Sequence, residues 1–541
     1  MKILTQYFSQ YLIFIISIMF VGCSAPEQSG QPISPNKALE TNKLLKEQKK
    51  PNIIVIYTDD MNFSDAGVFG GKVLTPTIDK LAQQGAKLNR YYANSPVCSP
   101  SRYNILTGRY ASYSHSLRDQ YPKSEPAFLR WNTHIEEEDT TIAELLKDSG
   151  YVTGMVGKYH NFDNEAVQLP NSEDSNARDI AVAKRIKTNY QNAIRAIKQT
   201  TEFDHIDRIY ANNLHALALP KELQHHNQEW ITEGALNFID KNYDKPFYLY
   251  LATTTPHVPA PVLSMKADPR ITPQGYLAKA PQVQASRESV FARTKQAGLP
   301  EEAAVMLWID DAITSIINKL SSHNLLDNTL IIFASDHSGA HGGRGKMTNY
   351  EGGVNTPALV WWPDKIKPQQ VNRLVSAVDI VPTILEAAGV NDEKITLDGK
   401  SMLPLLTGKV DKLRDEAYLE ITYTRGLVTE KWKYIAVRFP SKIQKDAQSN
   451  PGKYNQEGLL KTNDALAGIV RSRYNAHELH PHYFDFDQLY NLEQDPKEQH
   501  NLANNPEYAS ILTDLKKRLS LYVTPMPHDF GEFKKSTESK K

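Results

Sequence analysis

Cysteine is scarce in this 541-residue chain, which contains only Cys23 and Cys98. Two cysteines exclude the dense disulfide framework that stabilises many small secreted domains. A chain of this length buries enough surface for one large domain and a smaller one without such links. The only pairing available, a Cys23–Cys98 bridge, stays an alternative to separate roles for the two residues.

The chain also lacks an excess of charge, because Lys plus Arg and Asp plus Glu both number 62. No overall field is available to hold a nucleic acid, and we expect none as a partner. The glycines between Gly339 and Gly345 do not have the spacing of a phosphate-binding P-loop. Recognition of an anion must therefore depend on local groups.

No apolar run in the N-terminal region is long enough to predict a convincing membrane span. The run from Tyr7 to Val21 follows Lys2 and ends at Cys23 in a sequence that resembles a bacterial lipoprotein signal. We expect residues 1–23 to be this signal, with Cys23 lipidated, and residues 24–50 to be a polar tether. The protein would then be exported and anchored to a bacterial membrane, in the periplasm or at the cell surface. A plain cleaved secretory signal is the alternative.

Short apolar and β-branched runs predict buried parallel strands in an α/β domain over residues 51–400. Ligands of open α/β sheets bind beyond the carboxyl ends of such strands. Four predicted strands end in residues that can carry chemistry. These residues are Asp59 and Asp60, Lys158 and His160, His257, and Asp336 and His337.

Each strand end has a chemical interpretation and a structural alternative. Adjacent carboxylates such as Asp59 and Asp60 repel one another unless a cation joins them. Alternation along an extended segment places Lys158 and His160 on one side, where both can address one anion. His257 lies between two prolines on a stiff loop, which suits a positioned acid or base. A turn cap, a solvated lysine and incidental histidines are the alternatives.

A second acidic pair, Asp310-Asp311, lies inside a helix predicted from Glu301 to Leu320. Neighbouring side chains on a helix point about 100° apart, so these carboxylates do not converge on one ion. We interpret this pair as structural.

Cys98 lies at the predicted start of another helix. Pro100 suits the first helical position, Ser99 suits the cap before it, and Gly108 ends the pattern after Thr107. The amide groups and dipole of a helix start stabilise negative charge, so a nucleophile or an anion belongs there. A buried, inert cysteine is the alternative.

The sequence Cys98-Ser99-Pro100-Ser101-Arg102, followed by Leu106-Thr107-Gly108-Arg109, resembles the signature of the formylglycine-dependent sulfatases. In that family the Cys is oxidised after synthesis to an aldehyde, formylglycine, which becomes the nucleophile. The resemblance extends from Pro51 to about Leu502. It implies an alkaline phosphatase-like fold, with a large mixed, mostly parallel sheet flanked by helices, and maturation of Cys98 by a formylglycine-generating enzyme.

The resemblance also implies a calcium site, with Mg²⁺ the less favoured ion. Carboxylate oxygens suit such a hard cation. His337 stands where many relatives have Asn and supplies a softer nitrogen, and Ser338 replaces the more frequent Gly. The implied ligands are Asp59, Asp60, Asp336, His337 and the formylglycine at Cys98.

The implied mechanism begins when a hydroxyl of the hydrated aldehyde attacks sulfur in line. Arg102 would orient the diol, while Lys158 and Lys346 bind the sulfate oxygens. His257 would protonate the departing sugar oxygen. His160 would take the proton of the second hydroxyl, so that sulfate is expelled and the aldehyde is restored.

The composition changes at about residue 401, and alternating runs predict a C-terminal subdomain over residues 401–541 with a small antiparallel sheet and a helix. Residues 438–487 form a long insertion, which is either mobile surface or a set of sugar subsites. Its candidate substrate-binding residues are Arg471, Arg473, His477, His480 and His482.

The sequence as a whole predicts a sulfuric ester hydrolase that acts on a sulfated carbohydrate. A polysaccharide such as algal ulvan, or its oligosaccharides, is the expected substrate. A phosphonate or phosphate ester hydrolase of the same superfamily is one alternative, and a non-catalytic glycan-binding lipoprotein is another.

Overall fold

The computed structural model describes residues 50–163, 175–339, 345–390, 395–441, 479–483 and 485–533. The chain from Lys50 onward forms one compact unit. Cys23, the predicted signal and nearly all of the tether lie outside the described residues. In the part that is described, no helix combines the length and the apolar character that crossing a bilayer requires.

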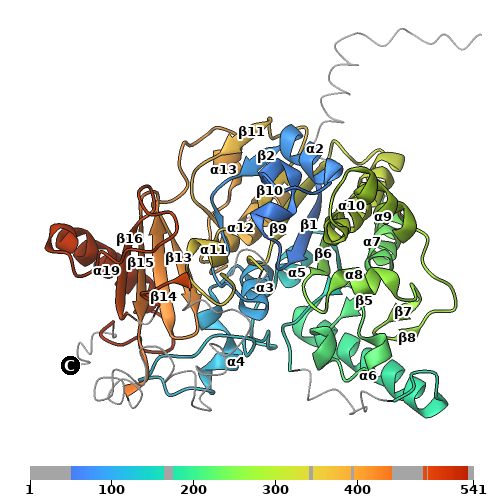
Figure 1. The fold of residues 1–541 in the computed structure, drawn as a ribbon, viewed down its shortest axis with the longest axis horizontal. Helices are drawn as coiled ribbons and strands as arrows, with labels where there is room; N and C mark the ends of the chain where they lie inside the picture. The colour runs from blue at the N-terminus through green and yellow to red at the C-terminus, as the bar shows by residue number, and fades with distance from the viewer. Residues whose placement is uncertain are drawn as a thin grey trace, which may run out of the picture. The chain divides into compact units, whose positions relative to one another are not determined.

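An eight-stranded mixed sheet forms the centre of the molecule (Figure 1), in the order β11-β2-β10-β9-β1-β6-β4-β5. Strand β1 runs parallel to β6 and β9, and only β10 runs antiparallel to its neighbours. All residues of β1 and β9 are buried, as expected for strands covered on both faces. The strands are β1 (Asn52–Asp59), β2 (Ala86–Leu88), β4 (Val152–Lys158), β5 (His205–Tyr210), β6 (Phe247–Pro256), β9 (Thr329–Ser335), β10 (Ala358–Trp361) and β11 (Gln369–Val371).

Two groups of helices flank this sheet. Right-handed crossovers that lead in opposite directions along a parallel sheet place their helices on opposite faces. One group contains α2 (Pro76–Gln84), α7 (Gln228–Asn242) and α10 (Ala304–Ser322), of which α10 contacts the other two. The other contains α3 (Cys98–Thr107), α5 (Ile142–Lys147) and α12 (Ile380–Ala388). The predicted fold class is confirmed.

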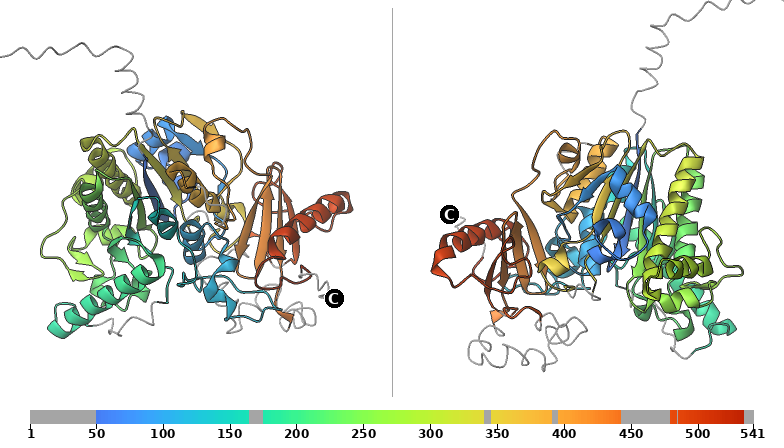
Figure 2. Two further views of the ribbon diagram at one scale, coloured as in Figure 1. Left: turned by 180° about the vertical axis from the view of Figure 1, so that it is seen from behind. Right: turned by 45° about the horizontal axis from the view of Figure 1, so that its top comes forward.

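A four-stranded antiparallel sheet lies beside the large sheet in all views (Figures 1 and 2). Its strands, in spatial order, are β13 (Glu416–Ile421), β14 (Thr424–Thr429), β15 (Trp432–Val437) and β16 (Asp487–Asn491). Helix α19 (Ala509–Val523) packs on this sheet through Leu515, Leu519 and Val523. The predicted small sheet and helix are confirmed, with β16 as a strand that the sequence did not predict. A domain boundary at residue 400 stays a prediction.

The remaining strands and α-helices lie outside these layers. They are β3 (Tyr91–Tyr92) paired with β12 (Val375–Ser376), β7 (Ile271–Thr272) paired with β8 (Gly275–Tyr276), and the helices α4 (His115–Arg118), α6 (Ile180–Thr201), α8 (Pro261–Lys266), α9 (Arg287–Gln296), α11 (Glu351–Val354) and α13 (Leu403–Leu406).

Candidate active site

The adjacent strands β1 and β9 bring two acidic segments together at the carboxyl edge of the large sheet. Thr58 pairs with Ser335, so the residues that follow each strand lie side by side. The backbone N–H of Asp60 donates to Oδ1 of Asp336 at 3.0 Å. Asp59, Asp60 and Asp336 are all buried. Burial raises the pKa of Asp336, whereas the charges of Lys158 and other nearby groups overcome burial and hold the pKa of Asp59 well below its usual value.

Cys98 is the first residue of α3 and is fully buried next to these carboxylates. Its Sγ lies 3.5 Å from Oδ1 of Asp59 and 3.3 Å from Nε2 of His337. Burial raises the pKa of the Cys98 thiol, which therefore stays neutral near pH 7.

The predicted cap of this helix is wrong. Val97 takes the extended N-cap conformation and no side chain caps the helix, which begins two residues earlier than expected. Pro100 is tolerated in the first turn because the amides there have no partner within the helix. Gly108 ends the helix with a positive φ of 71°, as predicted.

The end of β4 places a lysine beside Asp59. Lys158 Nζ lies 2.5 Å from Oδ2 of Asp59 and 2.6 Å from Oδ1 of Asn213. His160 is also buried, and its pKa is lowered well below the usual value by burial and then by the charge of Lys158. The expectation of simple alternation is wrong here, because His160 has a φ of 65° and the extended strand has already ended.

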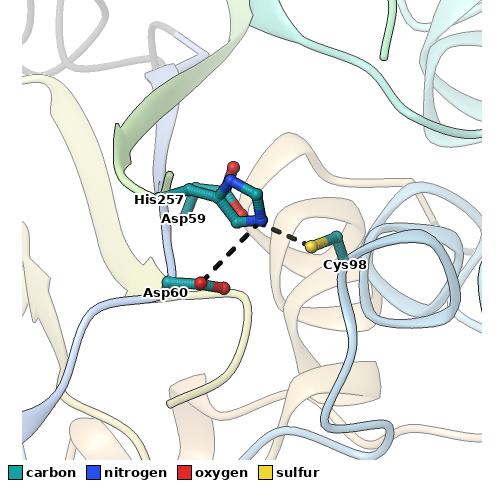
Figure 3. A group of neighbouring side chains, drawn as sticks. All are labelled: Asp59, Asp60, Cys98 and His257. Atoms are coloured by element: carbon teal, nitrogen blue, oxygen red, sulfur yellow. Dashed lines mark hydrogen bonds and ion pairs between the residues drawn. The ribbon is translucent and has the colours of Figure 1, made fainter. Parts of the chain in front are cut away.

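His257 follows β6 and turns its ring toward Asp60 and Cys98, as Figure 3 shows. Its Nε2 lies 3.9 Å from Oδ2 of Asp60, and its Nδ1 lies 2.7 Å from the carbonyl oxygen of Val258. A carbonyl only accepts, so Nδ1 carries a proton and Nε2 faces the site. Burial is the main cause that lowers the pKa of His257 to about 3.

Two further cations complete the group. Lys346 Nζ lies 2.7 Å from Oδ1 of Asp60 and 3.9 Å from Sγ of Cys98. Arg102 Nη2 lies 3.1 Å from Oδ2 of Asp336 and 3.7 Å from Oδ1 of Asp59. All these side chains are buried, so their charges act in a poorly screened environment.

The donor set fits a divalent cation. One ligand atom from each of Asp59, Cys98, Asp336 and His337 lies within 4.8 Å of the others. His337 Nδ1 lies 2.9 Å from the carbonyl oxygen of Ser338, to which it donates. In a neutral ring the lone pair of Nε2 then faces Oδ1 of Asp60 at 3.4 Å and Oδ1 of Asp336 at 3.6 Å. The lone pair and these carboxylate oxygens are ligand atoms that one divalent cation can join.

Two of the predicted sugar-binding residues, His480 and His482, lie in the part of the chain that the structure describes. His480 is buried and its ring stacks on Tyr350 with a centroid distance of 3.6 Å. His482 is partly exposed and pairs with Asp485. The remaining candidates, Arg471, Arg473 and His477, lie outside the described residues.

Two partners of the site, Tyr250 and Asn213, were missed by the sequence analysis. Tyr250, in β6, places its hydroxyl 3.1 Å from Nη1 of Arg102. Asn213 follows β5, the edge strand of the large sheet, and accepts from Lys158. The alternation of His205-Ile206-Asp207 breaks at Arg208, so this segment gave only a weak signal for a strand.

Comparison with known proteins bears on the identity of this site. A family model described as sulfatase matches residues 51–390, more than half of the chain. The chain belongs to the sulfatase family. Within this sulfatase, a second model, described as the C-terminal part of N-sulphoglucosamine sulphohydrolase, matches residues 339–445. The predicted family and the predicted enzyme class, sulfuric ester hydrolase, are confirmed.

Curated relatives extend over most of the sulfatase. An N-acetylgalactosamine-6-O-sulfatase of Bacteroides thetaiotaomicron is 27% identical and covers 90% of this chain and 97% of the relative. An ulvan-active sulfatase of Formosa agariphila is 26% identical and covers 93% of this chain and 85% of the relative. Human N-acetylgalactosamine-6-sulfatase is 30% identical over 66% of both chains.

Solved structures share the fold. A structure from work on the metabolism of multiple glycosaminoglycans by Bacteroides thetaiotaomicron has a TM-score of 0.59 at 22% identity, and covers 88% of this chain and 99% of that chain. A sulfatase from Pseudoalteromonas sp. has a TM-score of 0.54 at 22% identity, and covers 91% and 94%.

Proposed function

We propose that this sulfatase hydrolyses sulfate esters of a carbohydrate, using a formylglycine made from Cys98 and a divalent cation, with Ca²⁺ preferred over Mg²⁺. The observation that carries the proposal is the convergence of three carboxylates and the Nε2 lone pair of His337 around Cys98 at the start of α3. Asp59, Asp60, Asp336 and His337 would hold the cation.

The charge balance of the site suits an anionic substrate. Arg102, Lys158 and Lys346 offset the three carboxylates, so a bound divalent ion would leave an excess of positive charge. Lys158 and Lys346 carry their charges on flexible stems and can turn from carboxylates to the oxygens of a sulfate group. Such preorganised cations stabilise the charge that develops on the sulfuryl oxygens.

The buried state of the Cys98 thiol supports its conversion to formylglycine. A buried thiol with a raised pKa is a weak nucleophile, because the thiolate is the reactive form. When present, the formylglycine supplies a hydrated aldehyde whose hydroxyl attacks sulfur, and the cation favours loss of that hydroxyl's proton. Arg102, which already bonds to Asp336, is placed to orient this residue.

Two histidines would handle protons. His257 holds Nε2 toward the site and would deliver a proton from that atom to the departing sugar oxygen. Its ring is neutral in the free protein, and the arriving sulfate anion together with Asp60 would favour its charged form. His160, buried and neutral, would accept the proton of the second hydroxyl and so release sulfate.

A sulfated carbohydrate is the substrate class that we favour. Support comes from relatives that are named for N-acetylgalactosamine 6-sulfate and for ulvan and that cover most of this chain. Ulvan or its oligosaccharides remain the specific substrate that we propose. A phosphate or phosphonate ester hydrolase is the enzymatic alternative.

The deciding experiment measures sulfate release by ion chromatography from ulvan, other sulfated polysaccharides and their oligosaccharides. Cys98→Ala serves as the blank, and phosphate release from matched phosphate esters is measured in parallel. Release of sulfate from one glycan would identify the substrate. Phosphate release without sulfate release, from protein with the aldehyde confirmed at position 98, would favour the alternative.

We also propose that the enzyme is an exported lipoprotein anchored through Cys23. The support is the apolar run that ends at Phe20-Val21-Gly22-Cys23. Cys23→Ala should move the protein from the membrane fraction to the soluble fraction. Unchanged membrane association of this variant would contradict lipidation at Cys23.

A further inference from the structure

Another buried histidine, His226, lies close to the active site, and neither the sequence motif nor the proposed mechanism uses it. His226 immediately precedes the N-cap of α7, Asn227, and is 3% exposed. Its backbone N–H donates to Oγ of Ser264 at 3.0 Å, and the Asn227 side chain accepts from Trp230 N–H. The position of the His226 backbone is therefore fixed from two sides.

The ring of His226 joins the two ends of the segment that carries His257. Nδ1 of His226 lies 2.8 Å from Oγ1 of Thr254, three residues before His257. Nε2 lies 3.1 Å from the carbonyl oxygen of Pro259, two residues after His257.

The hydrogen-bond partners of His226 determine which of its ring nitrogens carries the proton. The carbonyl of Pro259 only accepts, so Nε2 of His226 carries the proton and donates it. Nδ1 then accepts from the hydroxyl of Thr254. This arrangement needs a neutral ring, and burial is the main cause that lowers the pKa of His226 to about 4. One donor and one acceptor on a rigid ring thus hold Thr254 and Pro259 at a set separation.

We propose that His226 is a positioning residue for His257, because it clamps the segment from Thr254 to Pro259 and thereby sets the direction of His257 Nε2. The ring of His257 is restrained from within the same segment, because its Nδ1 bonds to the carbonyl oxygen of Val258, the next residue. Its Nε2 lies 3.9 Å from Oδ2 of Asp60, too far for a hydrogen bond. This inference rests on the proposed function, in which His257 is the acid.

The test compares His226→Phe, which keeps the ring shape without its hydrogen bonds, with His226→Gln, whose amide can donate to Pro259. Thr254→Val removes only the other partner. His225→Phe is the matched control, since this neighbouring histidine is only half-buried. Turnover of 4-nitrophenyl sulfate and of phenyl sulfate is measured for each variant, because the poorer phenol leaving group depends more on the acid.

We expect His226→Phe to lower kcat on phenyl sulfate by up to about 100-fold, as a displacement near 1 Å of a catalytic group can do. The loss on 4-nitrophenyl sulfate should be at least several-fold smaller. Thr254→Val should show the same bias, His226→Gln should recover much of the activity, and His225→Phe should resemble the parent. In the His257→Ala background, His226→Phe should cause no further loss.

If His257→Ala shows the leaving-group bias, equal losses on the two substrates in His226→Phe, or an additive loss with His257→Ala, would overturn the proposal. A crystal structure of His226→Phe gives a readout apart from catalysis. It should show His257 Nε2 displaced from Asp60, and an unmoved His257 would also overturn the clamp. If His257→Ala itself shows no leaving-group bias while the ring is displaced in His226→Phe, the acid role fails and the clamp stands.

Discussion

Two clusters of charged side chains in this sulfatase are built differently. The sheet-edge cluster contains Asp59, Asp60 and Asp336 with Arg102, Lys158 and Lys346. The inter-sheet cluster contains Glu351, Lys433 and Glu498, which join α11 to the four-stranded sheet. Lys433 Nζ lies 2.7 Å from Oε1 of Glu351 and 2.9 Å from Oε1 of Glu498.

The charges of the inter-sheet cluster are paired with one another. Both carboxylates form ion pairs with the one ammonium group, and Oε2 of Glu498 also accepts from the backbone N–H of Glu351 at 2.7 Å. In the sheet-edge cluster, by contrast, several ligand atoms face one shared point next to Cys98. Charges that pair with one another stabilise the fold, whereas charges that converge on one point are suited to bind an ion or a substrate. A substitution in the inter-sheet cluster should therefore reduce stability, and a substitution in the sheet-edge cluster should reduce turnover.

The largest effect is expected at the sheet-edge cluster. Cys98→Ala should lower sulfate ester turnover by at least about 10⁴-fold, because removal of a nucleophile leaves only binding and electrostatic stabilisation. The thermal midpoint should change little, since Cys98 lies in the first turn of α3 and forms no disulfide. Turnover and differential scanning calorimetry of the same sample measure both. Turnover near the parent rate would remove Cys98 from the mechanism.

Lys433→Met, in the inter-sheet cluster, should lower stability and leave turnover nearly unchanged. It leaves Glu351 and Glu498 facing each other without a cation, and loss of one partner from a buried ion pair lowers the free energy of unfolding by about 3–5 kcal/mol. The matched control is Lys431→Met, since Lys431 is exposed and its pair with Glu493 contributes about 1 kcal/mol or less. Urea unfolding gives both values, and turnover at low temperature should stay near the parent rate. If Lys433→Met loses turnover but keeps the parent's free energy of unfolding, a purely stabilising role of the inter-sheet cluster is contradicted.

The contrast between the two clusters also explains which parts of the fold and of the site could be predicted from the sequence. The sheet-edge residues follow strands β1, β4, β6 and β9, whose apolar runs are continuous because both faces are covered. Once these strands are predicted as parallel, their ends must share an edge. The Asp310-Asp311 pair was predicted as structural on similar grounds, and Asp310 indeed accepts from the backbone N–H groups of Thr77 and Ile78.

No pattern in the sequence predicted the inter-sheet cluster. Glu351, Lys433 and Glu498 are far apart in the chain and belong to short elements, so no spacing rule connects them. The same holds for His226, whose ring partners lie about 30 residues away, one near the end of β6 and one just after it. The error at Ser99 and Pro100 was local, because several residues in one turn can satisfy the start of a helix.

Removal of divalent metal should affect the sheet-edge cluster alone. If Ca²⁺ binds there, a free concentration one hundred times Kd stabilises the fold by about 2.7 kcal/mol, which EDTA should abolish. Ca²⁺ should restore the thermal midpoint better than Mg²⁺, which requires strict octahedral geometry. Asp336→Asn should remove the response, and Lys433→Met should keep it. If EDTA leaves the thermal midpoint of the parent protein unchanged, a removable metal at this site is contradicted.

The smallest effect is expected from the pH dependence of the inter-sheet cluster. Burial is the main cause that raises the pKa of Glu498 to about 7, while Lys433 overcomes burial and lowers the pKa of Glu351. A carboxyl whose pKa is higher when folded binds more protons in the folded state. Glu498 therefore stabilises the fold most below its unfolded pKa, near 4.5, and this contribution is lost as the pH rises toward 7.

Glu498→Gln removes that titration but keeps an acceptor for the N–H of Glu351. The difference in free energy of unfolding, variant minus parent, should therefore rise between about pH 4.5 and pH 7. Urea unfolding across this range measures it, and the titration of His480 next to Tyr350 is common to both proteins and cancels. A difference that stays flat with pH would mean that Glu498 is already ionised throughout, with both carboxylates sharing the charge of Lys433.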